Sequence, residues 1–251
     1  IEPAQARLIG TLSGLERPVL ELLTYSDDGP VLSITEEGLV QWWTWPQLTG
    51  IRISATNPAT KLAGATLYTA ASLSPTGQLI LGAADGKLYL LAPDGSGPPQ
   101  PLSGHQGAVR ALAISGSSLV SGGDDGQTIV WDANSGKVKR KWSAHQDWVS
   151  ALAVQEKARL IVSAGYDLSV RLWNLDSAQK IRDLPTTLPD KKPAADTFPI
   201  PAVATALAFS PDGKLVAGGS LDGSIRLWDV SSGNLVRVLT GHASQITGIL
   251  F

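Results

Sequence analysis

One pattern of residues is repeated along this chain of 251 residues. Each clear copy contains a short apolar run, passes through a turn rich in Gly and Asp, and ends in a Trp followed by Asp or Asn. The three clear copies cover residues 103–132, 143–174 and 199–229. A period of about 40 residues, built from segments of strand length, is typical of folds in which copies of one small β-sheet pack side by side. This repeat constrains the fold more than any other feature.

Two weaker copies precede the clear ones. Residues 19–44 contain Trp43 near their end, and residues 71–92 carry Leu91 where the other copies have Trp. Extra length falls between copies, most clearly in residues 184–201, which hold five prolines. We interpret this insertion as a surface loop, with a functional loop as the alternative.

Four pieces of strand length lie within one copy: "AVRALAIS", "SLVSGG", "QTIVWD" and "KVKRKW". Each is alternating or rich in β-branched residues, and Asp125-Gly126 supplies a positive-φ turn between the second and third. The copy therefore predicts an antiparallel four-stranded meander. Because so small a sheet cannot bury both of its faces alone, several must pack around a common axis. The expected fold class is all-β, a β-propeller of four-stranded antiparallel blades.

These residues resemble the WD-repeat (WD40) β-propeller family, whose Gly-His and Trp-Asp signatures recur about once per blade. On that basis we expect one propeller over residues 1–251 with five full repeats, at approximately 15–60, 61–102, 103–142, 143–198 and 199–240. Residues 1–14 resemble a fourth strand, and residues 241–251 a Gly-His entry with one first strand. With partial pieces at both ends, the resemblance implies a fragment of a seven-bladed propeller. Its missing blades or domains would belong to the same longer chain.

The resemblance also implies a structural tetrad in each complete blade. In the family, the His of Gly-His bonds to a Ser of the second strand and to the turn Asp, and the Ser meets the Trp. By position the tetrads are His105, Ser121, Asp125 and Trp131, and His145, Ser163, Asp167 and Trp173. The last full copy keeps Asp222 and Trp228 but has Ile200 and Gly218 at the His and Ser places. We therefore expect its network to be broken.

Composition excludes several classes of function. There are 20 basic and 22 acidic side chains, so the net charge of −2 gives no electrostatic case for a nucleic-acid partner or an anionic membrane. No apolar run is long enough to span a membrane, and no signal peptide is recognisable. We expect a soluble protein and favour the cytoplasm, although the sequence does not fix the compartment. Without cysteine, thiolate nucleophiles and cysteine-bound metals are impossible.

A His, a Ser and an Asp in one network are also the three residue types of a hydrolase catalytic triad. The set occurs twice at equivalent repeat positions, the Ser lies within a strand, and no Gly-x-Ser-x-Gly sequence is present. All three histidines occupy repeat positions, and the Asp-rich turns lack the spacing of a calcium loop. We therefore expect no catalytic residue, no metal and no cofactor.

The expected function is a non-catalytic protein–protein interaction scaffold. The alternatives are a sensory or docking part of a larger multidomain bacterial protein, and a small-ligand or enzyme site in the central channel. A channel site needs carboxylates or His on the innermost strands, where "ALAIS", "ALAV" and "ALAF" are apolar.

Strand direction indicates where a partner binds. The turn between second and third strands and the connection to the next blade emerge on one face of a propeller, so the His loops and Asp turns share that face. The predicted partner-binding residues are Arg110, Asp124, Trp148, Ser150 and Tyr166. Aromatic residues and Arg are enriched at interface hot spots. We expect a protein or peptide partner with Trp148 as its anchor, the alternative being that Trp148 packs against its own loop.

Overall fold

The structure is a computed structural model that describes residues 19–23, 31–35, 39–43, 60–61, 68–74, 78–91, 98–186 and 202–251. Within these ranges the chain forms five antiparallel sheets of four strands, each sheet following the order of the sequence. The first two sheets are β1 (Val19–Leu23), β2 (Val31–Thr35), β3 (Leu39–Trp43) and β4 (Thr60–Lys61), then β5 (Tyr68–Leu73), β6 (Leu79–Ala83), β7 (Lys87–Leu91) and β8 (Gln100–Ser103). The third is β9 (Val109–Ser115), β10 (Ser118–Gly123), β11 (Gln127–Asp132) and β12 (Val138–Ser143). The fourth is β13 (Val149–Gln155), β14 (Leu160–Gly165), β15 (Val170–Asn174) and β16 (Lys180–Leu184), and the fifth is β17 (Ala204–Phe209), β18 (Leu215–Ser220), β19 (Ile225–Asp229) and β20 (Leu235–Leu239).

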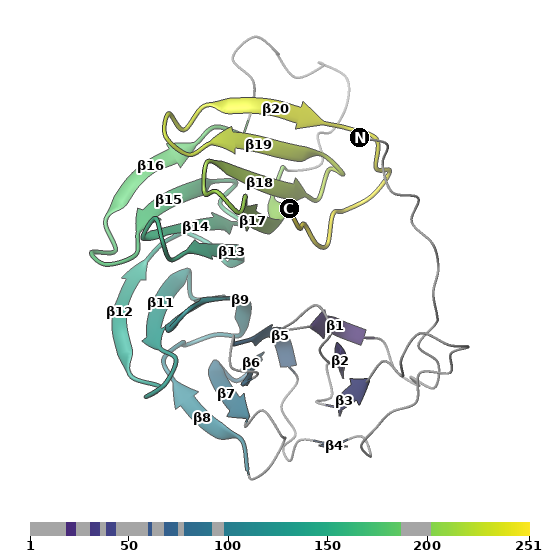
Figure 1. The fold of residues 1–251 in the computed structure, drawn as a ribbon, viewed down its shortest axis with the longest axis vertical. Coiled ribbons are helices and arrows are strands. Elements are labelled where there is room, and N and C mark those ends of the chain that lie inside the picture. Colours follow the sequence, from purple (N-terminus) through teal and green to yellow (C-terminus); the bar gives the residue numbers. More distant parts are fainter. Residues whose placement is uncertain are drawn as a thin grey trace.

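The five sheets are arranged radially around a common centre (Figure 1). The first strand of each sheet lies innermost and the fourth lies outermost, and the innermost strands β5, β9, β13 and β17 contact one another in that order. The fold is an all-β propeller, as the repeat predicts. The described residues contain no helix long and apolar enough to cross a membrane.

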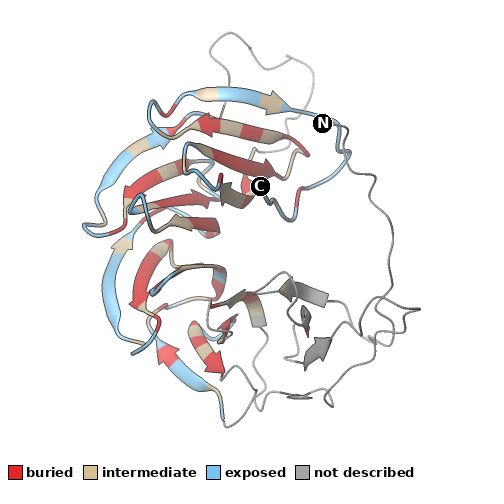
Figure 2. Ribbon diagram, viewed as in Figure 1, coloured by how far each residue is buried: buried red, intermediate tan, exposed pale blue. Residues whose placement is uncertain are grey.

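Burial follows the position of a strand within its sheet (Figure 2). All six residues of β10 are buried, because neighbouring sheets cover both of its faces. In the outermost strand β12 one residue, Trp142, is half-buried and the other five are exposed. This gradient explains why "SLVSGG" lacks long polar side chains whereas "VKRKWS" carries three cationic residues.

Tryptophan closes the space between neighbouring sheets. Trp131 lies in a buried cluster with Ile80 and Leu88 of the second sheet, and its side chain is almost fully buried. Trp173 belongs to the cluster between the third and fourth sheets, and Trp228 to the cluster between the fourth and fifth. An indole removes about 150 to 250 Å² from water, which at ~25 cal/mol per Å² is about 4 to 6 kcal/mol as an upper bound.

Residues 241–251 correct one expectation. They were expected to contain a first strand, but the structure assigns no strand to them. Among the described residues, no strand pairs with this segment in a sheet. Ile246 is nevertheless buried, its N–H donates to the Ser220 carbonyl at 3.1 Å, and its side chain occupies the space beside Gly219. The expected piece at 1–14 lies outside the described residues.

Candidate functional site

The third sheet brings its four tetrad residues into one hydrogen-bonded chain. Strand pairing sets Leu119 opposite Trp131, so the side chain of Ser121 is the diagonal neighbour of the indole on the same face. Trp131 Nε1 donates to Ser121 Oγ at 2.8 Å, and Ser121 Oγ lies 2.8 Å from His105 Nε2. His105 Nδ1 lies 2.9 Å from Oδ1 of Asp125 in the turn between β10 and β11.

The fourth sheet repeats this geometry. Trp173 Nε1 donates to Ser163 Oγ at 2.8 Å, and Ser163 Oγ lies 2.7 Å from His145 Nε2. His145 Nδ1 lies 2.9 Å from Asp167 Oδ1. The carboxylate of Asp167 also accepts from Arg171 at 3.0 Å, a partner that the third sheet does not supply at the equivalent position, where Ile129 stands.

The direction of the hydrogen bonds follows from the indole. Because an indole nitrogen can only donate, Ser121 Oγ accepts from Trp131 and its own hydrogen is free to point at His105 Nε2. With Nε2 as an acceptor the ring is neutral, and its single N–H, on Nδ1, donates to Asp125. Burial lowers the pKa of His105 and of His145, which favours this neutral form.

The turn carboxylates are stabilised in the charged form. Burial raises the pKa of Asp125, but hydrogen bonds from the Gln106 N–H and from His105 outweigh it and leave the pKa below its ordinary value. The pKa of Asp167 is likewise held well below its usual range, since hydrogen bonds from Ser169, His145 and the Gln146 N–H outweigh burial. These carboxylates accept hydrogen bonds from the backbone N–H groups of Gln106 and Gln146, and these bonds tie the His loops to the Asp turns.

The His, Ser and Asp distances match those of a hydrolase triad, but the environment does not. Ser121 and Ser163 are fully buried, and each hydroxyl already accepts a hydrogen bond from an indole. A nucleophile must be reachable by its substrate. The tetrad residues are instead packed between sheets and hydrogen-bonded to one another and to the loops above them.

The last sheet satisfies its buried groups without a tetrad. Trp228 Nε1 donates to the carbonyl of Pro185 at 2.7 Å. A Cβ at Gly218 would lie 2.7 Å from the Trp228 ring, so the ring occupies the space that a serine side chain would need. Buried Arg226 pairs with Asp222 at 3.0 Å in place of a histidine. Ile200, at the expected His place, lies outside the described residues. The Trp228 indole and the Asp222 carboxylate are nevertheless partnered, which the sequence alone did not reveal.

Four of the five predicted partner-binding residues gather on the face of the His loops and Asp turns. Arg110 at the start of β9 donates to both carboxylate oxygens of Asp124, at 2.6 and 2.9 Å. Its guanidinium lies 5.1 Å from the ring centroid of Trp148. Trp148 in turn meets the ring of Tyr166 edge to face, with centroids 5.4 Å apart. The third and fourth sheets thus share one continuous cluster.

The cluster is accessible although its members contact one another. Trp148 and Tyr166 are 42% and 41% exposed, so each ring packs on one side and is open to solvent on the other. Charged and aromatic groups held in fixed positions offer a binding surface with little ordering cost.

Ser150 lies apart from this cluster. Its hydroxyl donates to the Ala204 carbonyl of the next sheet at 2.6 Å. Thr69 and Thr205 make the same link, to the carbonyls of Val109 and Ile246. Ser150 is therefore occupied in joining innermost strands. Arg110 occupies the equivalent position in the third sheet. It has no hydroxyl, and its side chain pairs with Asp124 instead.

A cavity of about 500 Å³ lies at the centre, lined by residues of the innermost strands and of 245–249. Arg110 is the one charged residue among those described that line it. The described lining holds no carboxylate and no histidine, and the described residues form no cluster of His and acidic side chains suited to a metal. These observations do not favour the channel site considered above.

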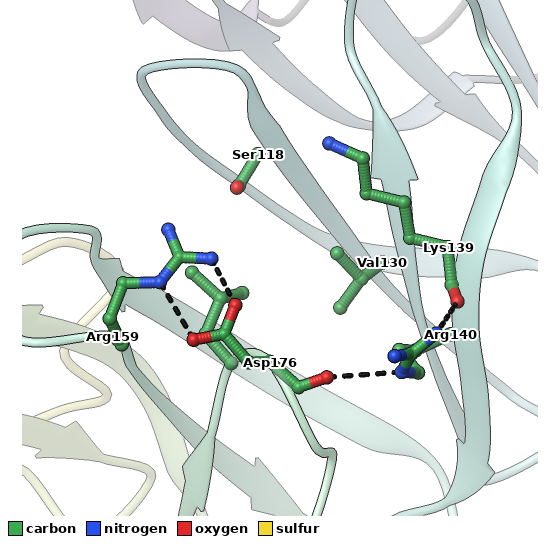
Figure 3. A pocket seen from close by; sticks show the side chains of 7 residues that line it. Ser118, Val130, Lys139, Arg140, Arg159 and Asp176 are labelled. Atoms are coloured by element: carbon green, nitrogen blue, oxygen red, sulfur yellow. Dashed lines mark hydrogen bonds and ion pairs between the residues drawn. The ribbon is translucent and has the colours of Figure 1, made fainter.

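A second hollow of about 170 Å³ lies on the opposite face, between the third and fourth sheets (Figure 3). Lys139, Arg140 and Arg159 line it, and each already has an acceptor. Lys139 pairs with Asp132 at 2.8 Å, Arg159 pairs with Asp176, and Arg140 donates to two backbone carbonyls. The cationic groups of this hollow are thus already paired or hydrogen-bonded within the protein.

Comparison with known proteins agrees with this geometry. The family model for the WD domain, G-beta repeat, matches residues 97–132, 136–174 and 197–229. The solved WD40 β-propeller domain of Doa1 superposes with a TM-score of 0.75 at 23% identity, over 95% of this chain and 74% of that one. The fold is thus that of a β-propeller. The chain carries WD40 repeats in these three places.

Several curated proteins are similar to part of the chain, which spans about a third of their length. Autophagy-related protein 16 of Arabidopsis thaliana is 29% identical over 151 residues, which is 59% of this chain and 27% of that protein. Small ribosomal subunit protein RACK1y of Oryza sativa is 36% identical over 133 residues, and nuclear distribution protein PAC1 of Gibberella zeae is 32% identical over 160. These matches span 52% and 61% of this chain, and 37% and 34% of the two relatives.

Proposed function

We propose that this chain is a non-catalytic interaction scaffold and that it binds a segment of a partner protein on the face of its His loops and Asp turns. The observation that carries the proposal is the linked cluster of Arg110, Asp124, Trp148 and Tyr166, in which two large aromatic rings stay about two-fifths exposed. Trp, Tyr and Arg are the residues that most often dominate binding energy at interfaces.

The position of Arg110 supports this assignment. Neighbouring sheets place a hydroxyl residue at the equivalent point and use it to link innermost strands. Arg110 gives up that link and instead lies against Trp148. The side chain at this place therefore serves the surface of the protein rather than the joining of its sheets.

The tetrads support the cluster from below. Asp125 and Asp167 hold the backbone of the loops at Gln106 and Gln146, and Trp148 follows two residues after the second of these. A surface fixed in advance loses little conformational freedom when a partner binds. We assign the tetrads this supporting role.

Affinity capture from the native organism tests the proposal, with bound proteins quantified by mass spectrometry. The wild type should retain a partner that Trp148→Ala loses, while the melting temperatures of the two agree. Lys139→Ala is the matched control, because Lys139 is similarly exposed but lies on the opposite face. Equal capture by wild type and Trp148→Ala would show that the partner does not use this surface.

A further inference from the structure

Leu168 adopts a backbone conformation that its residue type disfavours. Its φ is +64° in the turn between β14 and β15. The equivalent turn positions in the second, third and fifth sheets are Gly86, Gly126 and Gly223, with φ between +67° and +80°. Side chains with a Cβ are strained in this region, and glycine is not. A glycine at 168 would serve the turn better than leucine does.

The other two non-glycine residues with positive φ in the described chain do not share this problem to the same degree. The side chain of Arg159 forms an ion pair with Asp176, and Ala178 carries only a methyl group. Leu168 has a large apolar side chain that is 51% exposed and belongs to none of the described buried clusters. Neither the backbone conformation nor the buried clusters of the described residues explain the leucine.

Leu168 shares a turn with one of the two exposed aromatic residues. It lies two residues after Tyr166 in the same turn, and Tyr166 contacts Trp148. All three side chains are between 41% and 51% exposed. We call Trp148, Tyr166 and Leu168 the apolar patch. Strained residues are retained where they serve binding or catalysis.

The charges beside the patch favour a partner with a positively charged side chain. Asp147 precedes Trp148 and is exposed. Its Oδ1 accepts a hydrogen bond from the Trp148 N–H at 2.7 Å, and none of the ion pairs among the described residues involves it. The nearby cationic side chains Arg110 and Arg171 are already paired with carboxylates. An acidic partner would have to break such a pair, whereas a Lys or Arg can reach the exposed Asp147 carboxylate and the aromatic faces at once.

We propose that the apolar patch binds a partner segment in which a Lys or Arg stands beside an aliphatic or aromatic side chain, with Leu168 as a direct contact and Asp147 as the acceptor of the positive charge. This inference rests on the proposed function, since it names the partner chemistry of the same face. It adds a contact residue that the repeat pattern does not single out.

A phage-displayed library of random heptapeptides provides the probe. Selection is run on the intact chain and on Trp148→Ala, and a synthetic peptide of the resulting consensus is then titrated by fluorescence anisotropy. Peptides enriched on the wild type should combine Lys or Arg with an aliphatic or aromatic residue. Acidic consensus sequences, or no enrichment over Trp148→Ala, would overturn the proposal.

Leu168→Gly separates contact from folding. The variant relieves the strained φ, so it should melt at a higher temperature than the wild type and yet bind the consensus peptide about tenfold more weakly. Asp147→Asn should weaken binding several-fold and reduce its dependence on salt, and Lys139→Ala should change neither. If Trp148→Ala abolishes binding while Leu168→Gly retains wild-type affinity, the present inference fails and the proposed function stands.

Discussion

The indole N–H of Trp131 donates to the hydroxyl of Ser121 over 2.8 Å, and both side chains are almost completely buried. This bond joins the residue that fills the space between two sheets to the network that fixes the surface loop. Because Trp173 and Ser163 repeat the same distance, each of the two sheets couples its core packing to its own loop.

Removing the hydroxyl should leave two buried polar groups unsatisfied. Ser121→Ala strands the Trp131 N–H and His105 Nε2, so the free energy of unfolding should fall by about 1 to 3 kcal/mol. Urea titration followed by tryptophan fluorescence measures it. Ser117→Ala is the control, because Ser117 is exposed in the turn before β10 and should change stability by less than ~0.5 kcal/mol. No esterase or peptidase turnover should be detected in either protein.

As the pH falls, protonation of the tetrad histidines should lower folding stability before the carboxylates are protonated. The pKa values of His105 and His145 are lowered by burial, so below the ordinary pKa of 6.5 the unfolded chain binds more protons than the folded chain. Stability should therefore fall as the pH drops through 6.5 toward the folded pKa values. A second loss should follow below the ordinary value of 3.8, where Asp125 and Asp167 stay charged only in the folded state.

Urea titrations between pH 8 and 5 measure the first of these losses. The double variant His105→Asn, His145→Asn has no imidazole in either tetrad and should show a shallower decline over this range, from a lower starting stability. An equally steep decline in that variant would assign the pH dependence to other groups.

The last sheet should not tolerate a side chain at its Ser place. A Cβ at Gly218 would approach the Trp228 ring to 2.7 and 2.9 Å, so Gly218→Ala should cost about 1 to 3 kcal/mol. Gly248→Ala is a matched control, since nothing lies within 4 Å of the Cβ it would add. Thermal melts of the two variants compare them directly. Equal melting temperatures would contradict the packing of Trp228 against Gly218.

Exchanging Arg110 for a hydroxyl residue should separate stability from binding. Arg110→Thr restores the residue type that in the second and fourth sheets donates to the first residue of the next innermost strand, here the carbonyl of Val149. We expect an unchanged or slightly higher melting temperature together with loss of the captured partner. A variant that keeps full binding would show that Arg110 is not part of the binding surface.

The sequence predicts the fold because the repeat consists of patterns that are local in the sequence. Alternation, turn residues and the Trp-Asp ending are all local, and the four-stranded meander follows from them. The pairing of His105 with Asp125 was expected from resemblance to the family. The joint placement of Trp148 and Tyr166 was expected from strand direction alone.

Contacts between sheets were harder to anticipate. Ser150 was assigned to the surface, but its hydroxyl links β13 to β17, a contact that depends on how neighbouring sheets are offset. The acceptor of the Trp228 indole is a backbone carbonyl at Pro185, forty-three positions away, and no residue type encodes it. The repeat pattern does not single out Leu168, and only its φ and its exposed side chain distinguish it.

Hydrogen–deuterium exchange with and without the captured partner tests the central claim most directly. The account predicts added protection in residues 104–110, 123–126, 144–150 and 165–169, which form the face of the His loops and Asp turns. Residues 115–118, 132–137 and 156–160 lie on the opposite face and should exchange at the same rate in both states. Protection confined to that opposite face would contradict the account.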